Sequence, residues 1–271
     1  MADYRYVFLI GAARSGTKFL RDTIALSADV AAVPYDVNYV WRHGNENCPH
    51  DELQPDDVDQ RTADYIRKSI TRLALKNRDS KPKVILEKTV SNTLRVETIR
   101  RVFPEAEFIR LERPGLDVVE SSYRQWTQPT DRSYLLEKLR YFPVREWRYA
   151  LWFAKNALTE RQTAPIWGPR YSGIETDLER LGVAQTCAVQ WKRSVELSRE
   201  QGKKSDTIDV RYSTLGLDLT RALQQLEVSD ADKVSSSFSE SFSTVRSWPG
   251  EVPSVDQQAC LEIVQTVVPE P

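Results

Sequence analysis

A glycine loop lies directly between a strand-like segment and a helix-like segment near the start of the chain. Residues 4–26 read YRYVFLIGAARSGTKFLRDTIAL. Residues 4–10 are β-branched and aromatic, which is typical of a buried strand, and after the loop the apolar residues recur with helical spacing. The stretch therefore predicts a strand, a glycine loop and a helix, in that order.

The middle of the chain contains a second unit of this kind. Residues 83–86 (KVIL) predict a buried strand, residues 91–102 have helical spacing, and residues 107–111 (EFIRL) predict another strand. A strand, a helix and a strand within roughly thirty residues form the crossover unit of a parallel sheet. We therefore expect an α/β protein with a three-layer fold like that of P-loop nucleoside triphosphatases, in which helices flank a central parallel sheet.

The same patterns assign the remaining segments. We expect strands at 29–33 and 207–212, and helices at 65–75, 115–126, 177–201, 213–226 and 254–267. Residues 35–59 are predicted to form a surface excursion, and the serine-rich residues 235–247 a flexible loop. Because no repeat or change of composition divides the chain, residues 1–271 are interpreted as a single domain with substrate-side insertions near 35–60 and 127–175.

The overall charge excludes binding through a global electrostatic field. The 38 Lys and Arg residues nearly balance the 39 Asp and Glu residues, so nucleic acid and anionic membranes are not expected partners. Three cysteines, far apart and without the spacing of metal ligands, indicate neither a disulfide framework nor a zinc site. Since no apolar run reaches about eighteen residues, we expect a soluble cytoplasmic protein without a membrane span.

Residues 11–18 (GAARSGTK) lie where the first predicted strand leads into its helix, a place where backbone N–H groups and the helix dipole favour an anion. The nucleoside triphosphate pattern GxxxxGK[ST] requires a lysine directly after its second glycine. Here Gly16 is followed by Thr17 and only then by Lys18, while Arg14 lies inside the loop. The loop suits an anion without carrying that signature. In the alternative interpretation, the glycines only form a tight turn and Arg14 is a surface cation.

Two segments carry a resemblance to a known family. Residues 11–36 (GAARSGTKFLRDTIALSADVAAVPYD) and residues 87–122 (EKTVSNTLRVETIRRVFPEAEFIRLERPGLDVVESS) together resemble the sulfotransferases that use 3′-phosphoadenosine 5′-phosphosulfate (PAPS) as donor. The similarity is greatest to the bacterial and Golgi branches, which are related to the protein-tyrosine and glycan sulfotransferases. The resemblance implies transfer of a sulfuryl group to a hydroxyl, with 3′-phosphoadenosine 5′-phosphate (PAP) as product and no metal ion.

The resemblance also implies which residues hold the donor. It assigns the 5′-phosphosulfate to the loop residues Arg14, Ser15, Gly16, Thr17 and Lys18. Arg113 and Ser121, eight residues apart, match the pair that binds the 3′-phosphate. Tyr212 matches a tyrosine that contacts the nucleotide, and Trp248 lies in a segment resembling the one that closes over it.

One departure from the family pattern concerns a cation. The family commonly places Asp-Pro-Arg after the strand arginine, whereas Pro114, Gly115 and Leu116 stand here, so we expect Arg124 to compensate. Purely structural roles are the alternative for three of these residues. Arg113 could pair with Glu112 or Asp117, Ser121 could be an ordinary helix residue, and Tyr212 could be a core aromatic.

The chemistry needs positive charge at the breaking bond and a base at the acceptor. By the resemblance, Lys88 stabilises the departing group, together with the loop cations, as negative charge develops on the bridging oxygen. Its structural alternative is a solvated cation paired with Glu87. For the base that accepts the hydroxyl proton, we rank Asp36 first, Glu87 second and His43 third.

The acceptor is expected to be a carbohydrate or a cell-surface glycan. Residues 134–171 combine aromatic residues with several arginines, a composition that suits sugar rings and anionic glycans, although a helical stripe such as that around Trp147 is also typical of a core. Two other functions stay open at this point: a P-loop kinase of a small molecule, supported only by the loop and fold class, and a nucleotide-binding protein of the same fold without activity. The sequence does not predict an oligomeric state.

Overall fold

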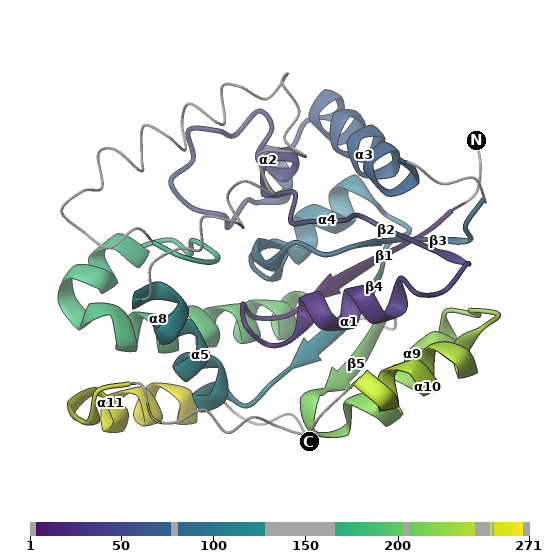
Figure 1. Cartoon of the computed structure of the whole chain (residues 1–271). Coiled ribbons are helices and arrows are strands. Elements are labelled where there is room, and N and C mark those ends of the chain that lie inside the picture. Colours follow the sequence, from purple (N-terminus) through teal and green to yellow (C-terminus); the bar gives the residue numbers. More distant parts are fainter. Residues whose placement is uncertain are drawn as a thin grey trace.

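The central layer is a sheet of five parallel strands (Figure 1). The computed structural model describes residues 4–76, 81–127, 166–202, 206–241, 250 and 252–267. The strands are β1 (Arg5–Ile10), β2 (Val30–Ala32), β3 (Val84–Glu87), β4 (Glu107–Glu112) and β5 (Thr207–Arg211), in the order β2-β3-β1-β4-β5. The predicted central parallel sheet is therefore confirmed.

Helices cover both faces of the sheet. One face packs against α1 (Thr17–Ile24), α9 (Leu215–Gln225) and α10 (Ala231–Ser241), and the other against α3 (Gln60–Leu75) and α4 (Val96–Val102) (Figure 1). A third group, α5 (Gly115–Thr127), α8 (Ile174–Gln201) and α11 (Ser254–Gln265), packs together beside the sheet. The three-layer α/β architecture agrees with the prediction from sequence.

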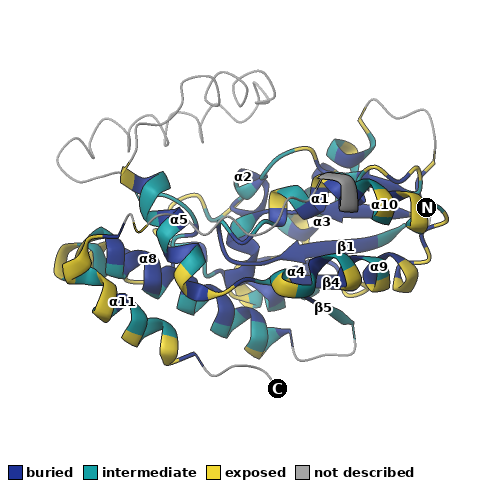
Figure 2. Ribbon diagram, turned by 60° about the horizontal axis from the view of Figure 1, so that its bottom comes forward, coloured by how far each residue is buried: buried dark blue, intermediate teal, exposed yellow. Residues whose placement is uncertain are grey.

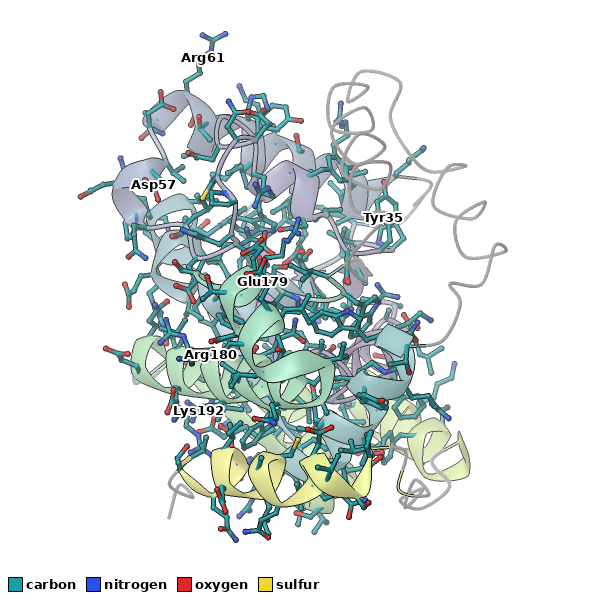
Figure 3. All side chains as sticks on the ribbon, turned by 90° about the vertical axis from the view of Figure 1, so that its left-hand side faces the viewer. Tyr35, Asp57, Arg61, Glu179, Arg180 and Lys192 are labelled. Atoms are coloured by element: carbon teal, nitrogen blue, oxygen red, sulfur yellow. The ribbon has the colours of Figure 1, made fainter. Side chains whose placement is uncertain are left out.

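Strand β1 shows why both faces must be covered. Tyr6, Phe8 and Ile10 belong to the core under α3 and α4, whereas Val7 and Leu9 belong to the core under α1 and α9. Successive side chains of a strand point to opposite faces, so a strand apolar at every position is buried on both. In Figure 2 the middle of the molecule is accordingly dark blue, while charged side chains such as Arg61 and Arg180 project outward from α3 and α8 (Figure 3).

The parallel register brings the carboxyl ends of the strands to one edge. Ile10 is in register with Arg110 of β4, and Phe8 with Glu87 of β3. Chemistry-bearing segments follow four of these ends directly or within a few residues: the loop 11–16 after β1, Lys88 after β3, Arg113 after β4 and Tyr212 after β5. Asp36 follows β2 after three intervening residues. The edge is the place where ligands bind in open α/β sheets.

The prediction that residues 35–59 form a surface excursion was wrong. They contain the short helix α2 (Asn38–Trp41) and the 3₁₀ helix η1 (Pro55–Asp57), and Trp41 is fully buried against Phe8, with ring centroids 5.9 Å apart. The polar composition misled the prediction because several of these polar residues, Arg42 and Asp51 among them, are buried with partners rather than solvated.

The serine-rich segment also differs from its prediction. The part up to Ser241 belongs to α10, where Val234 and Phe238, four residues apart, are buried and Phe238 lies 5.7 Å from Phe19 of α1. Two apolar side chains on one face therefore outweigh the poor helix propensity of serine. Residues 242–249 lie outside the described residues.

Two predicted helices are interrupted. Residues 90–94 form the 3₁₀ helix η2 (Val90–Leu94), and the backbone leaves helical geometry at Arg95 before α4 begins. Helix α8 begins earlier than predicted and breaks at Gly182. The predicted helix 213–226 begins with the 3₁₀ helix η4 (Tyr212–Thr214) and continues as α9.

The described residues contain neither a helix suited to crossing a membrane nor a cluster suited to holding a metal ion. None of their helices combines the length and the apolar character that crossing a membrane requires. No group of three or more His, Cys, Asp or Glu side chains in the same part of the chain could hold a metal ion.

Candidate active site

The loop after β1 is a narrow turn with an unusual backbone. Arg14 has a φ of 68° and Gly16 a φ of 100°, both in the left-handed region, and the amide and hydroxyl of Ser15 both donate to the carbonyl of Ala12, at 3.1 and 2.6 Å. A Cβ on Gly11 would lie 2.7 Å from the carbonyl oxygen of Leu111, so this glycine is required by a close approach of β4. The tight turn of the alternative interpretation is therefore present, and Arg14 lies within it.

Four predicted donor-binding residues meet beside this loop. The Nε of Arg14 donates to the Oγ of Ser121 at 3.0 Å, and an Nη of Arg113 donates to the carbonyl oxygen of Arg14 at 3.3 Å. The guanidinium of Arg113 lies over the ring of Tyr212, 4.4 Å from its centroid. We call Arg14, Arg113, Ser121 and Tyr212 the donor cluster. Their roles stay predictions, but the structure brings all four together from three strand ends and helix α5.

Positive charge dominates the donor cluster. Burial lowers the pKa of Arg14 from its ordinary value, and the charges of Arg124 and Arg113 lower it further. Arg124 lies three residues after Ser121 on α5, so the two side chains share a helix face. A guanidinium whose pKa is lowered by neighbouring cations is stabilised by an anion placed among them.

Arg113 does not use Glu112 as its partner. Glu112 accepts from the Nε and an Nη of Arg199 on α8, at 2.8 and 2.5 Å. The carboxylate of Asp117 is 3.7 Å from the Nε of Arg113, and that buried Nε makes no hydrogen bond within the described part of the chain. Of the two structural roles weighed for Arg113, only a distant ion pair with Asp117 is present, which leaves donor capacity for a ligand.

The remaining predicted donor residues are placed differently. Ser15 and Thr17 are buried, with Thr17 as the first residue of α1. Lys18 is exposed and pairs with Asp22 one helical turn later, at 3.1 Å, so the structure does not bring its ammonium to the donor cluster. Trp248 lies outside the described residues.

Lys88 and Asp36 form an ion pair at the ends of β3 and β2. The Nζ of Lys88 donates to an oxygen of Asp36 at 2.7 Å. The side chain of Lys88 is 6% exposed and that of Asp36 is 26% exposed, so the carboxylate is the more accessible partner. Lys88 is therefore neither solvated nor paired with Glu87, as its structural alternative required. A cation and a candidate base stand side by side.

Glu87 is enclosed. It is fully buried, and its two oxygens accept from the Oγ1 of Thr89 at 2.5 Å and the Nδ2 of Asn92 at 2.7 Å. Burial, reinforced by the charge of Asp36, raises the pKa of Glu87 to about 7. A pKa near neutrality suits a base, but both oxygens are occupied by protein donors.

His43 lies in a different environment. Its ring stacks on that of Tyr65 from α3, with centroids 3.7 Å apart, and its Nδ1 is 3.9 Å from Glu46. These contacts tie the imidazole to α3 and to Glu46, and neither links it to the Lys88–Asp36 pair.

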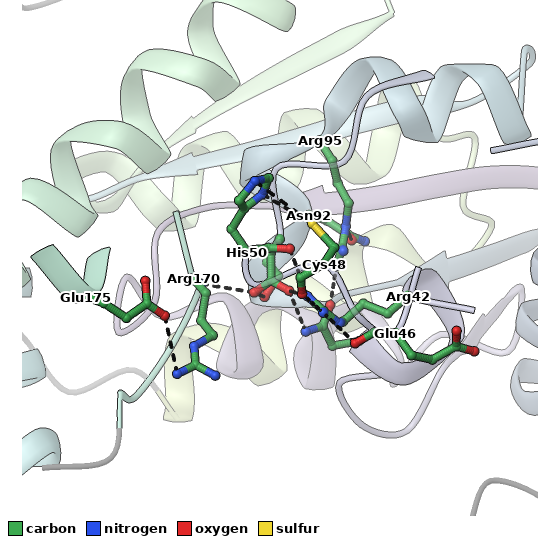
Figure 4. Close-up of polar contacts among 11 residues, drawn as sticks. Arg42, Glu46, Cys48, His50, Asn92, Arg95, Arg170 and Glu175 are labelled. Atoms are coloured by element: carbon green, nitrogen blue, oxygen red, sulfur yellow. Dashed lines mark hydrogen bonds and ion pairs between the residues drawn. The ribbon is translucent and has the colours of Figure 1, made fainter. Parts of the chain in front are cut away.

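Sequence reasoning missed a set of buried polar residues next to Asp36. Arg42, Asp51 and Arg95 are each no more than 2% exposed and are joined by hydrogen bonds among residues 38–53 and 87–95 (Figure 4). Nothing in the local pattern distinguished them from solvated charges, because their burial depends on the folded chain: Asp51, for example, also contacts Ser91 and the backbone of Arg170, 40 and 119 residues away.

Comparison with known proteins identifies the family. A family model described as "Sulfotransferase family" matches residues 6–166, more than half of the chain. A search of curated proteins found no match. Among solved structures, a sulfotransferase from Alicyclobacillus acidocaldarius is 15% identical with a TM-score of 0.49, over 98% of this chain and 96% of that one. The sulfotransferase STF1 from Mycobacterium tuberculosis is 13% identical with a TM-score of 0.43, over 87% of this chain and 71% of that one. On the strength of the family match, this chain belongs to the sulfotransferase family.

Proposed function

We propose that this protein transfers a sulfuryl group from PAPS to a hydroxyl group of a carbohydrate or cell-surface glycan. The observation that carries the donor part is the donor cluster, in which Arg14 contacts Ser121 and Arg113 contacts both Arg14 and Tyr212. These residues are distant in sequence, yet Arg14, Arg113 and Tyr212 follow three different strands and meet Ser121 of α5.

The donor cluster fits a nucleotide with two anionic ends. Arg113 offers a guanidinium fork to the 3′-phosphate, with the hydroxyl of Ser121 as a second donor. Residues 14–18 lead into the first turn of α1, which begins at Thr17 and whose backbone N–H groups favour the 5′-phosphosulfate. The ring of Tyr212 lies close to Gly16, and a face of the nucleotide would be bound nearby.

In the transfer step, Lys88 and Asp36, which we call the acceptor-side pair, have different tasks. The bond between sulfur and the bridging oxygen of the 5′-phosphate breaks while a bond between sulfur and the acceptor oxygen forms. The electron pair stays on the bridging oxygen, where Lys88 and Arg14 stabilise the developing charge and PAP leaves. Asp36 takes the proton of the incoming hydroxyl, and Glu87 is the second candidate for this role.

The proposed acceptor rests on composition. The sequence predicts substrate-side insertions near 35–60 and 127–175, and the second combines tryptophan and tyrosine with arginine. Aromatic faces beside cations suit sugar rings that carry anionic groups.

Calorimetry tests the donor class before an acceptor is known. We expect PAP to bind and adenosine 5′-phosphate to bind much more weakly, each equally well with excess chelator, because protein cations do the work that Mg²⁺ performs for kinases. Binding of ATP only with Mg²⁺, and none of PAP, would support the small-molecule kinase instead. Tight PAP binding without transfer to any of a panel of glycans would leave a nucleotide-binding protein and remove the proposed reaction.

A further inference from the structure

Asp51 joins three segments that are distant in sequence. One carboxylate oxygen accepts from the Nδ2 of Asn38 at 3.0 Å and an Nη of Arg42 at 3.1 Å. The other accepts from the Oγ of Ser91 at 2.8 Å and the backbone N–H of Arg170 at 2.9 Å. The residue is 2% exposed. A single buried side chain therefore ties α2, η2 and the segment before α8 to one another.

The connection to Arg170 runs in both directions. The backbone N–H of Asp51 donates to the carbonyl oxygen of Arg170 at 2.6 Å, which closes a ring with the bond to the Asp51 carboxylate. Next to it, Arg193 of α8 donates to Glu52 at 3.2 Å. The two substrate-side insertions predicted from sequence, near 35–60 and 127–175, thus meet at residues 51 and 170.

From Asn38 a line of hydrogen bonds continues to β3. The Oδ1 of Asn38 accepts from Arg95, whose Nε donates to the Oδ1 of Asn92 at 2.9 Å. The Nδ2 of Asn92 then donates to Glu87 at 2.7 Å. Every link in this line is at least partly buried, so water competes poorly for its donors and acceptors.

The line ends beside Asp36. Glu87 accepts from the Oγ1 of Thr89 at 2.5 Å, and the same Oγ1 accepts from the backbone N–H of Val37 at 2.9 Å. Val37 is the residue after Asp36, whose carboxylate contacts Lys88. We call the residues from Asp51 to Val37 along this line the acceptor-side network: Asp51, Asn38, Arg95, Asn92, Glu87, Thr89 and Val37.

Burying such a network in a core costs more free energy than burying apolar side chains. Taking an ion out of water costs several kcal/mol, and well-packed apolar residues in place of buried ion pairs are often neutral or stabilising. Burial by itself would raise the pKa of Asp51, but the charge of Arg95 and the hydrogen bonds from Arg170 and Asn38 hold it below the ordinary value, so Asp51 is ionised. A contribution to stability does not explain why an ionised Asp51 is buried here, whereas a role in fixing the geometry of its neighbours does.

We propose that Asp51 is a positioning residue for sulfuryl transfer: through the acceptor-side network it holds Asp36 against Lys88 and couples that pair to the segment at Arg170. The role of the held pair rests on the proposed function. The coupling itself is a property of the fold and is measurable without turnover.

Amide hydrogen exchange at Val37 measures the coupling directly. In Asp51→Asn, which keeps the shape of the side chain but removes its charge, we expect exchange at Val37 to accelerate about 10-fold or more, as loss of a buried hydrogen bond implies. The amide of Val7 in β1 should be unchanged, and PAP affinity should stay within about 2-fold of the wild type, because the donor cluster is built from other segments. Asp56→Asn, an exposed acid of the same segment, is the matched control and should change neither.

Measurements of turnover distinguish a positioning role of Asp51 from a purely structural one. With an acceptor in hand, Asp51→Asn should lower kcat about 10-fold or more while the KM for PAPS is retained. Equal acceleration at Val37 and Val7 would show global destabilisation and overturn the proposal, as would an unchanged Val37 in the folded variant. If Asp51→Asn does not fold, Ser91→Ala, which removes one bond to Asp51, decides by the same readouts. Absence of PAP binding to the wild type would remove the proposed function but leave the exchange result intact.

Discussion

The two sides of the candidate site handle charge in opposite ways. At the donor cluster, burial and the positive charges of Arg124 and Arg113 lower the pKa of Arg14. On the acceptor side Lys88 pairs with Asp36 and Arg42 with Asp51. Like charges held close together are stabilised when an anion arrives, whereas paired charges are already satisfied. This difference supports the proposal that a bound anion completes the donor side, whereas the acceptor side already has its own ion pairs.

The largest expected effect comes from removing the base. Asp36→Asn should lower turnover by about 10²–10⁴ and abolish the acidic limb of the pH–rate profile while PAP affinity is kept, because the amide cannot accept the hydroxyl proton. Glu87→Gln should not show this combination if Asp36 is the base. The check is kcat against pH for both variants with an identified acceptor.

The two variants also decide the ranking. If Glu87→Gln shows the loss and Asp36→Asn does not, the enclosed carboxyl is the base and opens during the reaction. If both keep near-normal turnover and His43→Ala abolishes it, the assignment to the acceptor-side pair is wrong.

The next effect concerns Lys88. Lys88→Ala should lower turnover by about 10²–10³ with PAP affinity nearly unchanged, since it removes a cation that acts on the breaking bond. Lys83→Ala is a suitable control, because Lys83 lies at the opposite end of β3, is 58% exposed and pairs with Asp29. Steady-state kinetics measure the turnover of both variants, and titration with PAP measures their affinity for the nucleotide. A fall in PAP affinity as large as the fall in rate would move Lys88 to the donor side.

Donor recognition gives a smaller expected effect. Arg113→Ala should weaken PAP binding by about 2–4 kcal/mol, through loss of a charge-assisted bidentate contact, and adenosine 5′-phosphate binding far less. Calorimetry with both nucleotides measures the difference. Arg180→Ala, on the outer face of α8 (Figure 3), controls for loss of a positive charge. Equal losses for the two nucleotides would contradict recognition of the 3′-phosphate.

An effect of comparable size is on stability and arises within the acceptor-side network. The pKa of Glu87 is about 7 in the folded protein against 4.5 for the free side chain. A raised pKa favours folding while the group is protonated, so its contribution is full below about pH 4.5 and is lost as the pH rises through about 7. At one pKa unit per 1.36 kcal/mol, the loss approaches about 3 kcal/mol.

Glu87→Gln should remove that dependence. Its unfolding free energy relative to the wild type should increase between about pH 5 and about pH 8, as measured by urea denaturation. Glu179→Gln, an exposed residue of α8, should leave the pH dependence as it is. Parallel pH profiles for Glu87→Gln and the wild type would show that Glu87 is ionised throughout.

Prediction from sequence succeeded where the signal was local. The runs YRYVFLI, KVIL and EFIRL became β1, β3 and β4, because a strand buried on both faces must be apolar at successive positions. Arg113 and Ser121, singled out by their spacing, both contact Arg14 in the structure, while their role in donor binding stays a prediction. It failed for residues 35–59 and for α10, where contacts with distant elements overrode composition.

By itself, the sequence determined the order of the strands and helices and the family. It also determined which candidate donor-binding residues lie in the loop, at strand ends and on a helix. These depend on periodicity, glycine and short spacings, which are properties of neighbouring residues. Only the tertiary structure decided that Lys88 pairs with Asp36, that Glu87 is enclosed, and that Asp51 joins residues 38, 91 and 170. The physical reason is that a buried charge is stable only with its partners in place, and here the partners lie up to 119 residues away along the chain.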